Sequence, residues 1–268
     1  MKTIIFVLSF TFLIISAQRE QEIVNNRIVN GQDADISDFP HALSLLDLGR
    51  YICGASVISR NFALSAAHCL ARNAPPTIYT LTGGSTNRLV GSIVFHVINY
   101  TNHPQYRTIR LSTGQVIWDH DVSVIEIDGN PSFEGHNNVR PTLLPNVCTS
   151  DCCGVCEGTV VTIAGWGRTH LGTIPMILQK LNQTIVNHES CGPFWENEIT
   201  DRMFCVTATF YDSCDGDSGS GILNIDRHNQ LGYVSFGSII CGDGSAPAVY
   251  GRLEHPEIRN FVREISGV

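Results

Sequence analysis

The sequence predicts an all-β protein that ends in a single α-helix. Short segments rich in Val, Ile and aromatic residues recur along the chain, and turn-forming Gly, Asn, Asp and Pro separate them. A helical period occurs only near the C-terminus. There Ile258, Phe261, Val262 and Ile265 recur at helical spacing, and Pro256 suits the first helical turn.

Several stretches carry the strand pattern most clearly, each a run of β-branched and aromatic residues closed by turn residues. They are residues 51–58, 93–98, 122–127, 160–164 and 233–238. No internal repeat is visible in the sequence. The pattern therefore predicts many short strands, but it does not predict how they combine into sheets.

The N-terminus predicts export from the cell. Residues 1–17 have the form of a secretory signal peptide: Lys2, a short apolar run over residues 4–15, and small residues at its end. The alternative is a membrane anchor, for which the run is short. Residues 18–27 are polar and lack a core-forming pattern, so we interpret them as a propeptide. We expect a secreted mature chain over residues 28–268.

Composition restricts the partners. The chain has a formal net charge of −8, which makes nucleic acid and anionic membranes poor partners. The ten cysteines all follow the expected signal peptide. An even number of cysteines in a secreted chain favours disulfides over free thiols.

Ser218 is the strongest candidate for a nucleophile. It follows Gly216-Asp217 in a glycine-rich turn, and a serine hydroxyl needs a neighbouring base and oxyanion donors to react. His68 lies far upstream in a small-residue context beside Cys69, and Asp121 lies between the two. The order His, Asp, Ser is one of the known orders of a catalytic triad.

Four segments together resemble the trypsin-like (chymotrypsin-fold) serine peptidases, in that family's order and at about its spacing. They are Ile28-Val29-Asn30-Gly31 after Arg27, Ala66-Ala67-His68-Cys69, Gly165-Trp166-Gly167 and Gly216-Asp217-Ser218-Gly219. The resemblance implies two packed six-stranded antiparallel β-barrels over about residues 28–145 and 146–250. A C-terminal helix would follow over about residues 256–266, and the catalytic groups would lie between the barrels.

The resemblance assigns the catalytic roles. His68 would be the general base, Asp121 would orient its imidazole, and the backbone N–H groups of Gly216 and Ser218 would form the oxyanion hole. Asp119 is the lesser candidate for the acid, because the acid in this family precedes an apolar strand, as Asp121 does. His120 is the lesser candidate among the histidines, because His68 lies in a small-residue context beside Cys69.

The resemblance also implies a zymogen. Cleavage between Arg27 and Ile28 would expose an α-amino group that pairs with buried Asp217. The activator would be a trypsin-like protease or the enzyme itself. Tyr51 stands where the family often has a histidine that pairs with this aspartate before cleavage, so we do not expect that restraint here.

Substrate preference would depend on Asp212, which matches the carboxylate at the floor of the pocket in members that cut after Arg or Lys. Ala248 adds a methyl group where such members usually have glycine, so an altered preference is the alternative. Trp118 would favour small residues in the next subsite. The remaining expected substrate-binding residues are Ser213, Ser235 and Gly237.

The resemblance implies the disulfides Cys53–Cys69, Cys191–Cys205 and Cys214–Cys241. The other four cysteines, Cys148, Cys152, Cys153 and Cys156, crowd into the connection between the barrels. Direct pairing of adjacent Cys152 and Cys153 is strained, so we expect each to pair with Cys148 or Cys156. A four-thiolate zinc site is the alternative. Asn99 and Asn182 begin glycosylation sequons.

We expect no cofactor and no metal. Residues 79–87 lack the acidic ligands of the calcium loop of vertebrate trypsins, so we expect no calcium there. The expected partners are protein or peptide substrates and protein protease inhibitors, and the expected state is a monomer. A non-catalytic binding relative of the same fold is the alternative. It would require Ala248, Ser220 or Gly221 to distort the site, since the family commonly has Gly-Pro where Ser220-Gly221 stands.

Overall fold

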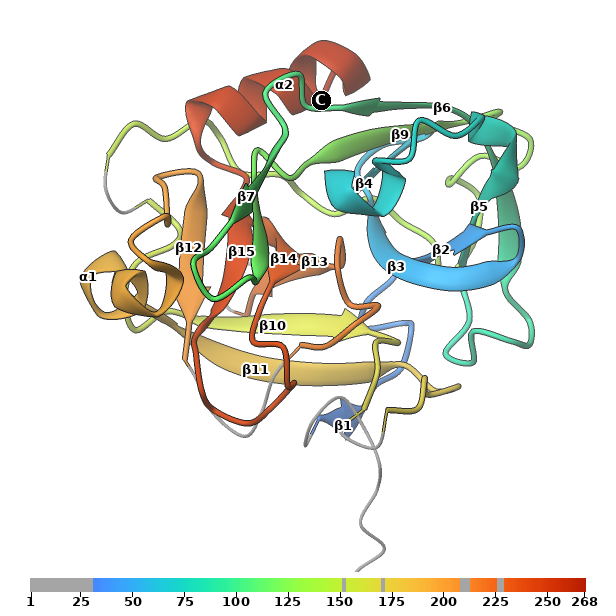
Figure 1. The fold of residues 1–268 in the computed structure, drawn as a ribbon. Coiled ribbons are helices and arrows are strands. Elements are labelled where there is room, and N and C mark those ends of the chain that lie inside the picture. The colour runs from blue at the N-terminus through green and yellow to red at the C-terminus, as the bar shows by residue number, and fades with distance from the viewer. Residues whose placement is uncertain (1–30, 151–152, 170–171, 208–212, 226–228) are drawn as a thin grey trace, which may run out of the picture.

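Two antiparallel β-barrels pack against each other in this chain (Figure 1). The computed structural model describes residues 31–150, 153–169, 172–207, 213–225 and 229–268. The first barrel closes in the order β2-β3-β4-β9-β6-β5. Its strands are β2 (Ala42–Asp47), β3 (Arg50–Val57), β4 (Phe62–Ser65), β5 (Tyr79–Gly83), β6 (Ile93–Asn102) and β9 (Ser123–Ile127).

The second barrel follows the order β11-β10-β13-β14-β15-β12 and closes where β12 pairs with β11, with Ile185 opposite Val206. The predicted pair of six-stranded barrels is thereby confirmed. Its strands are β10 (Val160–Gly165), β11 (Gln179–Val186), β12 (Met203–Val206), β13 (Gly221–Asn224), β14 (Gln230–Phe236) and β15 (Ala248–Arg252). The short β1 (Gln32–Asp33) adds to the outside of β11.

Alternation of apolar residues explains these strands. In β5, Tyr79 and Leu81 point into the core of the first barrel, while Thr80 and Thr82, which alternate with them, are half-buried. Strand β14 is buried along its whole length, because its two faces have different partners. Val234 packs in the core of the second barrel, and Tyr233 packs between the barrels.

The C-terminal helix α2 (Pro256–Ser266) is confirmed where its period predicted it. The His255 side chain caps it by accepting the Glu257 N–H, and Gly267 ends it in the left-handed conformation. Ile258 and Val262 pack against Val124 of the first barrel. The helix therefore covers one side of the space between the barrels.

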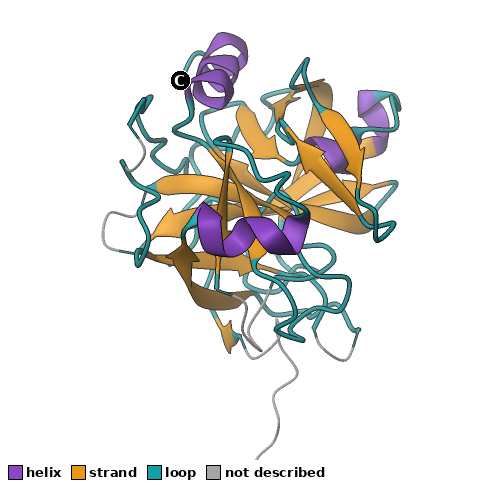
Figure 2. Cartoon of the chain, turned by 60° about the vertical axis from the view of Figure 1, so that its left-hand side comes forward, coloured by secondary structure: helices purple, strands orange, loops and turns teal. Residues whose placement is uncertain are grey.

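The sequence pattern did not predict the remaining short elements. They are the 3₁₀ turns η1 (Ala67–Leu70), η2 (Pro76–Ile78) and η3 (Gly192–Trp195), the helical turn α1 (His188–Cys191), and the hairpin β7 (Arg107–Arg110)–β8 (Val116–Asp119). Figure 2 shows the helical segments lying outside the strands. Among the residues described, no helix has both the length and the apolar character needed to cross a bilayer.

The disulfides Cys53–Cys69, Cys191–Cys205 and Cys214–Cys241 are all present. Cys148 is bonded to Cys153, and Cys156 is also disulfide-bonded. Cys152 lies outside the described residues, as does all of the expected signal peptide and propeptide. A zinc site with four thiolates is inconsistent with this arrangement, because bonded sulfurs are not thiolates.

Candidate active site

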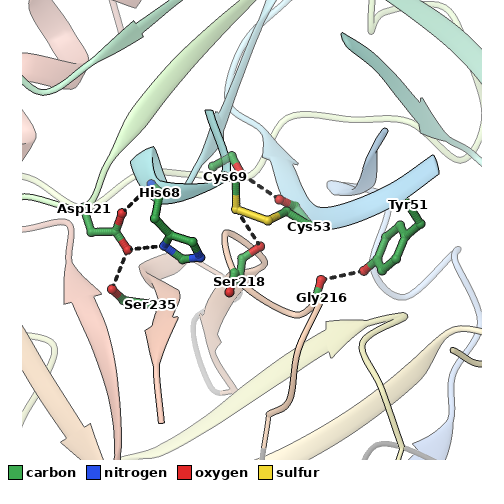
Figure 3. The surroundings of a disulfide bond; sticks show 10 residues. Tyr51, Cys53, His68, Cys69, Asp121, Gly216, Ser218 and Ser235 are labelled. Carbon is green, nitrogen blue, oxygen red and sulfur yellow. Dashed lines mark hydrogen bonds and ion pairs between the residues drawn. A yellow bond between two sulfur atoms is a disulfide. The ribbon is translucent and has the colours of Figure 1, made fainter. Parts of the chain in front are cut away.

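His68 and Asp121 meet at the edge of the first barrel. His68 lies on η1, directly after the end of β4, and Asp121 lies between β8 and β9. The His68 Nδ1 is 2.7 Å from Asp121 Oδ2, and the His68 backbone N–H donates to Asp121 Oδ1 over 2.8 Å (Figure 3). An ionised carboxylate only accepts hydrogen bonds, so this contact places the proton on Nδ1 and leaves Nε2 free to accept one.

Ser235 on β14 also holds the carboxylate, since its hydroxyl donates to Asp121 Oδ2 over 2.6 Å. Asp121 is buried, with 3% of its surface exposed. The second barrel thus contributes directly to the orientation of a first-barrel side chain.

Ser218 comes from the second barrel and lies beside the imidazole, on the side away from Asp121 (Figure 3). Its backbone carbonyl accepts the Gly54 N–H over 2.9 Å, which ties the turn to β3. Between these two described side chains, no hydrogen bond joins His68 Nε2 to Ser218 Oγ. Such contacts are often loose without substrate and shorten when it binds.

The turn around Ser218 requires glycine at two positions. Gly216 has a φ of +95°, and a Cβ there would lie 2.9 Å from Tyr51 Cε1. Gly219 has a φ of +81°, and its Cβ would lie 2.2 Å from Ser65 Oγ. Both backbone angles are costly for other residues. The close approach to β3 and β4 excludes larger residues as well.

Asp217 is fully buried beneath this turn. Its carboxylate accepts the Gly167 N–H over 2.9 Å and the Cys214 N–H over 3.0 Å. Burial raises the pKa of Asp217 from 3.8 to about 6 in spite of these two donors. Among the described residues, no cationic group pairs with it. A buried carboxylate without a cationic partner among these residues is costly to ionise.

Tyr51 makes a contact that the sequence did not indicate. Its hydroxyl donates to the carbonyl of Gly216 over 2.7 Å (Figure 3). Burial raises the pKa of Tyr51 well above 10, so the hydroxyl stays protonated. The Arg88 guanidinium lies 5.5 Å from the ring centroid, within range of a cation–π contact.

Trp118, at β8, stacks on the imidazole of His68, with ring centroids 4.1 Å apart and planes inclined by 14°. The edge of its ring approaches Phe236 of the second barrel. No sequence signal predicted this stack. It covers one face of the base and limits the rotation of the imidazole.

Asp119 and His120 belong to a separate network that faces α2. Asp119 accepts hydrogen bonds from Arg107 and Arg202, and His120 Nε2 lies 2.9 Å from Glu257 Oε2. Burial alone would raise the pKa of Asp119, but the hydrogen bonds from Arg202 and Arg107 and the charge of Arg202 outweigh it and lower the pKa to about 2. Neither residue contacts Ser218.

A cleft of about 1120 Å³ runs past His68, Trp118 and Ser218. The expected substrate-binding residues that line it are Trp118, Ser213, Ser235 and Gly237, together with Gly216 and Ser218. Ala248 is buried at the start of β15 and is not part of the described lining. Beside it, the Trp195 indole donates to the Pro247 carbonyl over 3.1 Å. Asp212, Arg27 and Ile28 lie outside the described residues.

Ser220 fits its position without displacing the turn. Its hydroxyl faces the α-carbon of Gly54, where a Cβ would lie only 2.0 Å from Ser220 Oγ. Ser220 is buried, and its backbone carbonyl accepts the Val234 N–H over 3.0 Å. The glycine on β3 therefore compensates for the serine, and the geometry gives no support to a site distorted at this residue.

The described residues contain one cluster with three metal-ligand atoms, formed by Cys53, His68 and Cys69. Both cysteine sulfurs are in a disulfide, so this cluster lacks the thiolates a metal would need.

Comparisons with known proteins agree with this geometry. A family model described as Trypsin matches residues 28–260. Trypsin epsilon of Drosophila erecta is 30% identical over 237 residues, which cover 87% of this chain and 85% of that protein. Trypsin delta and trypsin gamma of Drosophila melanogaster are each 28% identical over 232 residues, or 85% of this chain and 84% of each relative.

A solved structure shares the fold. It is described as neuropsin, a serine protease expressed in the limbic system of mouse brain. The two chains superpose with a TM-score of 0.73 at 23% identity, over 88% of this chain and 98% of that one. The solved structure shows the fold. The family model and the relative at 30% identity show that the chain belongs to the trypsin family of serine endopeptidases.

Proposed function

We propose that this protein is a secreted endopeptidase made as a zymogen, activated by cleavage between Arg27 and Ile28, that cuts peptide bonds after Arg or Lys. The observation that carries the proposal is the contact of His68 with Asp121 beside Ser218. Protein and peptide chains are its substrates, and protein protease inhibitors are expected partners. The sequons at Asn99 and Asn182 carry exposed asparagines that a glycosyltransferase could reach.

In the first chemical step, Ser218 Oγ attacks the scissile carbonyl while His68 Nε2 takes the hydroxyl proton. The oxyanion accepts hydrogen bonds from the N–H groups of Gly216 and Ser218. The C–N bond then breaks, and His68 returns the proton to the leaving amine. A water molecule attacks the acyl-enzyme by the same route and releases the acid. Asp121 stabilises the imidazolium throughout.

Preference for Arg or Lys rests on Asp212. We expect Asp212→Ser to lower kcat/KM for an Arg nitroanilide by roughly 100-fold or more, because the substrate cation loses its partner in a partly dry pocket. The measurement is steady-state hydrolysis by the chain cleaved at Arg27-Ile28, with exposed Asp201→Ser as the control. Cleavage after short or apolar residues by the unaltered protein would instead indicate the altered preference associated with Ala248.

Tyr51 is proposed as a positioning residue for the oxyanion hole. Tyr51→Phe removes the donor to the Gly216 carbonyl but keeps the ring, so we expect kcat to fall about tenfold with little change in KM. Affinity for a peptide aldehyde should weaken in proportion, because an aldehyde adduct carries the oxyanion.

The matched control is Tyr79→Phe in the same barrel. The Tyr79 hydroxyl is buried without a hydrogen-bond partner among the described atoms, so its removal should leave kcat unchanged. Equal kcat values for Tyr51→Phe and the unaltered enzyme would contradict the positioning role.

A further inference from the structure

The cleft carries a concentration of positive charge that the chain as a whole lacks. Four arginines line it: Arg50, Arg72, Arg88 and Arg168. The described carboxylates of the same lining are Asp47 and Asp215. Acidic residues outnumber basic ones over the whole chain, which has a net charge of −8. A cationic lining in an acidic protein favours anionic groups on whatever occupies the cleft.

Three of these four arginines, Arg50, Arg88 and Arg168, lie around Tyr51 and the turn that it contacts. Arg50 precedes Tyr51 on β3, Arg88 lies against the Tyr51 ring, and Arg168 binds the Asp215 carbonyl through its backbone N–H. Figure 3 shows Tyr51 and Ser235 on opposite sides of Ser218. These three arginines therefore lie on the Tyr51 side of Ser218.

Substrate direction follows from the proposed function, on which this inference rests. The acyl part of the substrate would run along Ser235 and Gly237, next to the specificity pocket. The leaving part must then continue past Ser218 toward Tyr51. Residues after the cut bond would come to lie among the arginines.

The charges of these arginines are only partly neutralised. Among the described residues, no carboxylate pairs with Arg50 or Arg88. Arg72 is 80% exposed and lies 3.5 Å from Asp47, while the Arg168 side chain lies 3.9 Å from an Asp215 that is 85% exposed. Exposed pairs of this kind are weak and exchange partners readily. A substrate carboxylate could therefore recruit these guanidinium groups, which bind carboxylates in bidentate geometry.

We propose that the leaving-group side of the cleft selects peptides with Asp or Glu among the first three residues after the cut bond. Arg50, Arg88 and Arg168 are the specificity-determining residues. The enzyme thus recognises a basic residue before the cut and acidic residues after it.

The experiment uses internally quenched peptides that share one acyl sequence ending in Arg. Their leaving sides carry either Ala-Ala-Ala, Ala-Asp-Glu or Ala-Lys-Lys. We expect kcat/KM for the acidic peptide to exceed that of the alanine peptide by about tenfold, with the lysine peptide slowest. The acidic preference should shrink as salt rises from about 20 mM to about 0.5 M, because exposed charges are screened.

Variants assign the effect to the arginines. Arg50→Gln and Arg168→Gln should each reduce the ratio of acidic to alanine peptide by roughly two- to fivefold. Arg88→Gln should reduce the ratio by the same factor. Because the ratio compares two peptides on one enzyme, it is unaffected if kcat falls when the contact of Arg88 with the Tyr51 ring is lost. The control is Arg140→Gln, an exposed arginine outside the cleft, which should keep the full ratio.

An Arg nitroanilide separates this inference from the proposed function, because its leaving group does not extend along the arginines. Nitroanilide hydrolysis with equal rates for the acidic and alanine peptides at low salt would overturn the inference alone. The inference would also be overturned if the ratio of acidic to alanine peptide persisted in the variant that combines Arg50→Gln, Arg88→Gln and Arg168→Gln. Binding of a sulfated polysaccharide, together with equal rates for all the peptides, would also overturn the inference, because the arginines would then bind a polyanion and not the substrate.

Discussion

Ser218→Ala is expected to reduce kcat for Arg amide hydrolysis by roughly 10⁴-fold or more, with KM little changed. The substitution removes the only atom that would form the acyl-enzyme, while the cleft that binds substrate stays intact. Steady-state kinetics on the cleaved protein measures it. Ser220→Ala, which removes another buried hydroxyl of the same turn, should stay within a few-fold of the unaltered enzyme.

His68→Ala should cost about as much as Ser218→Ala, and the double variant should cost no more than either. Groups that act as one unit lose their joint effect when either is removed. Additive losses would mean that His68 and Ser218 work independently. That result would contradict the geometry in which Asp121 orients His68 toward Ser218.

The charge of Asp217 is expected to make the stability gained on activation depend on pH. Burial raises the pKa of Asp217 from 3.8 to about 6 in the folded chain. A carboxyl with a raised pKa stabilises the folded state only while it is protonated, so this contribution is lost as pH rises from about 4 to about 6. A shift of this size corresponds to about 3 kcal/mol.

Cleavage after Arg27 would place the Ile28 ammonium against Asp217 and lower the pKa of the carboxyl. The cleaved chain would then keep the stability that the uncleaved chain loses as pH rises. The free energy of unfolding in urea, measured on a Ser218→Ala background, should therefore differ little between cleaved and uncleaved chains near pH 4. The difference should grow by up to about 3 kcal/mol by pH 7, in favour of the cleaved chain.

Asp217→Asn supplies the control for this comparison, because its side chain cannot ionise and the gap between the two forms should then be independent of pH. The same variant should remain inactive after cleavage, since the turn that carries Gly216 and Ser218 loses its anchor. A pH-independent gap in the protein that keeps Asp217 would show that no charge pair forms on activation.

The sequence predicted five of the strands, β3, β6, β9, β10 and β14, and it supplied the catalytic candidates. These strands follow from runs of β-branched and aromatic residues closed by turn residues, and α2 follows from a helical period with Pro256 at its start. His68, Asp121 and Ser218 could be selected because each lies in a recognisable segment. The closure into two barrels came from the resemblance and not from periodicity, because pairing such as that of β11 with β12 has no local signal.

What the sequence could not predict are contacts between distant segments. The Tyr51 hydroxyl reaches the Gly216 carbonyl across 165 positions of sequence, and its partner is a backbone atom that leaves no trace in residue type. The stack of Trp118 on His68 likewise depends on the hairpin of β7 and β8, which the pattern missed. His120 is adjacent to Asp121 in the sequence, yet its side chain contacts Glu257, which no sequence pattern indicated.

The central claim is that Ser218 becomes a nucleophile once the chain has been cleaved between Arg27 and Ile28. Mass spectrometry of the protein treated with a fluorophosphonate tests this directly. We expect close to one label per molecule, located on Ser218, in the cleaved chain, and almost none in the uncleaved chain or in His68→Ala. A cleaved, folded protein whose Ser218 remains unlabelled would contradict it.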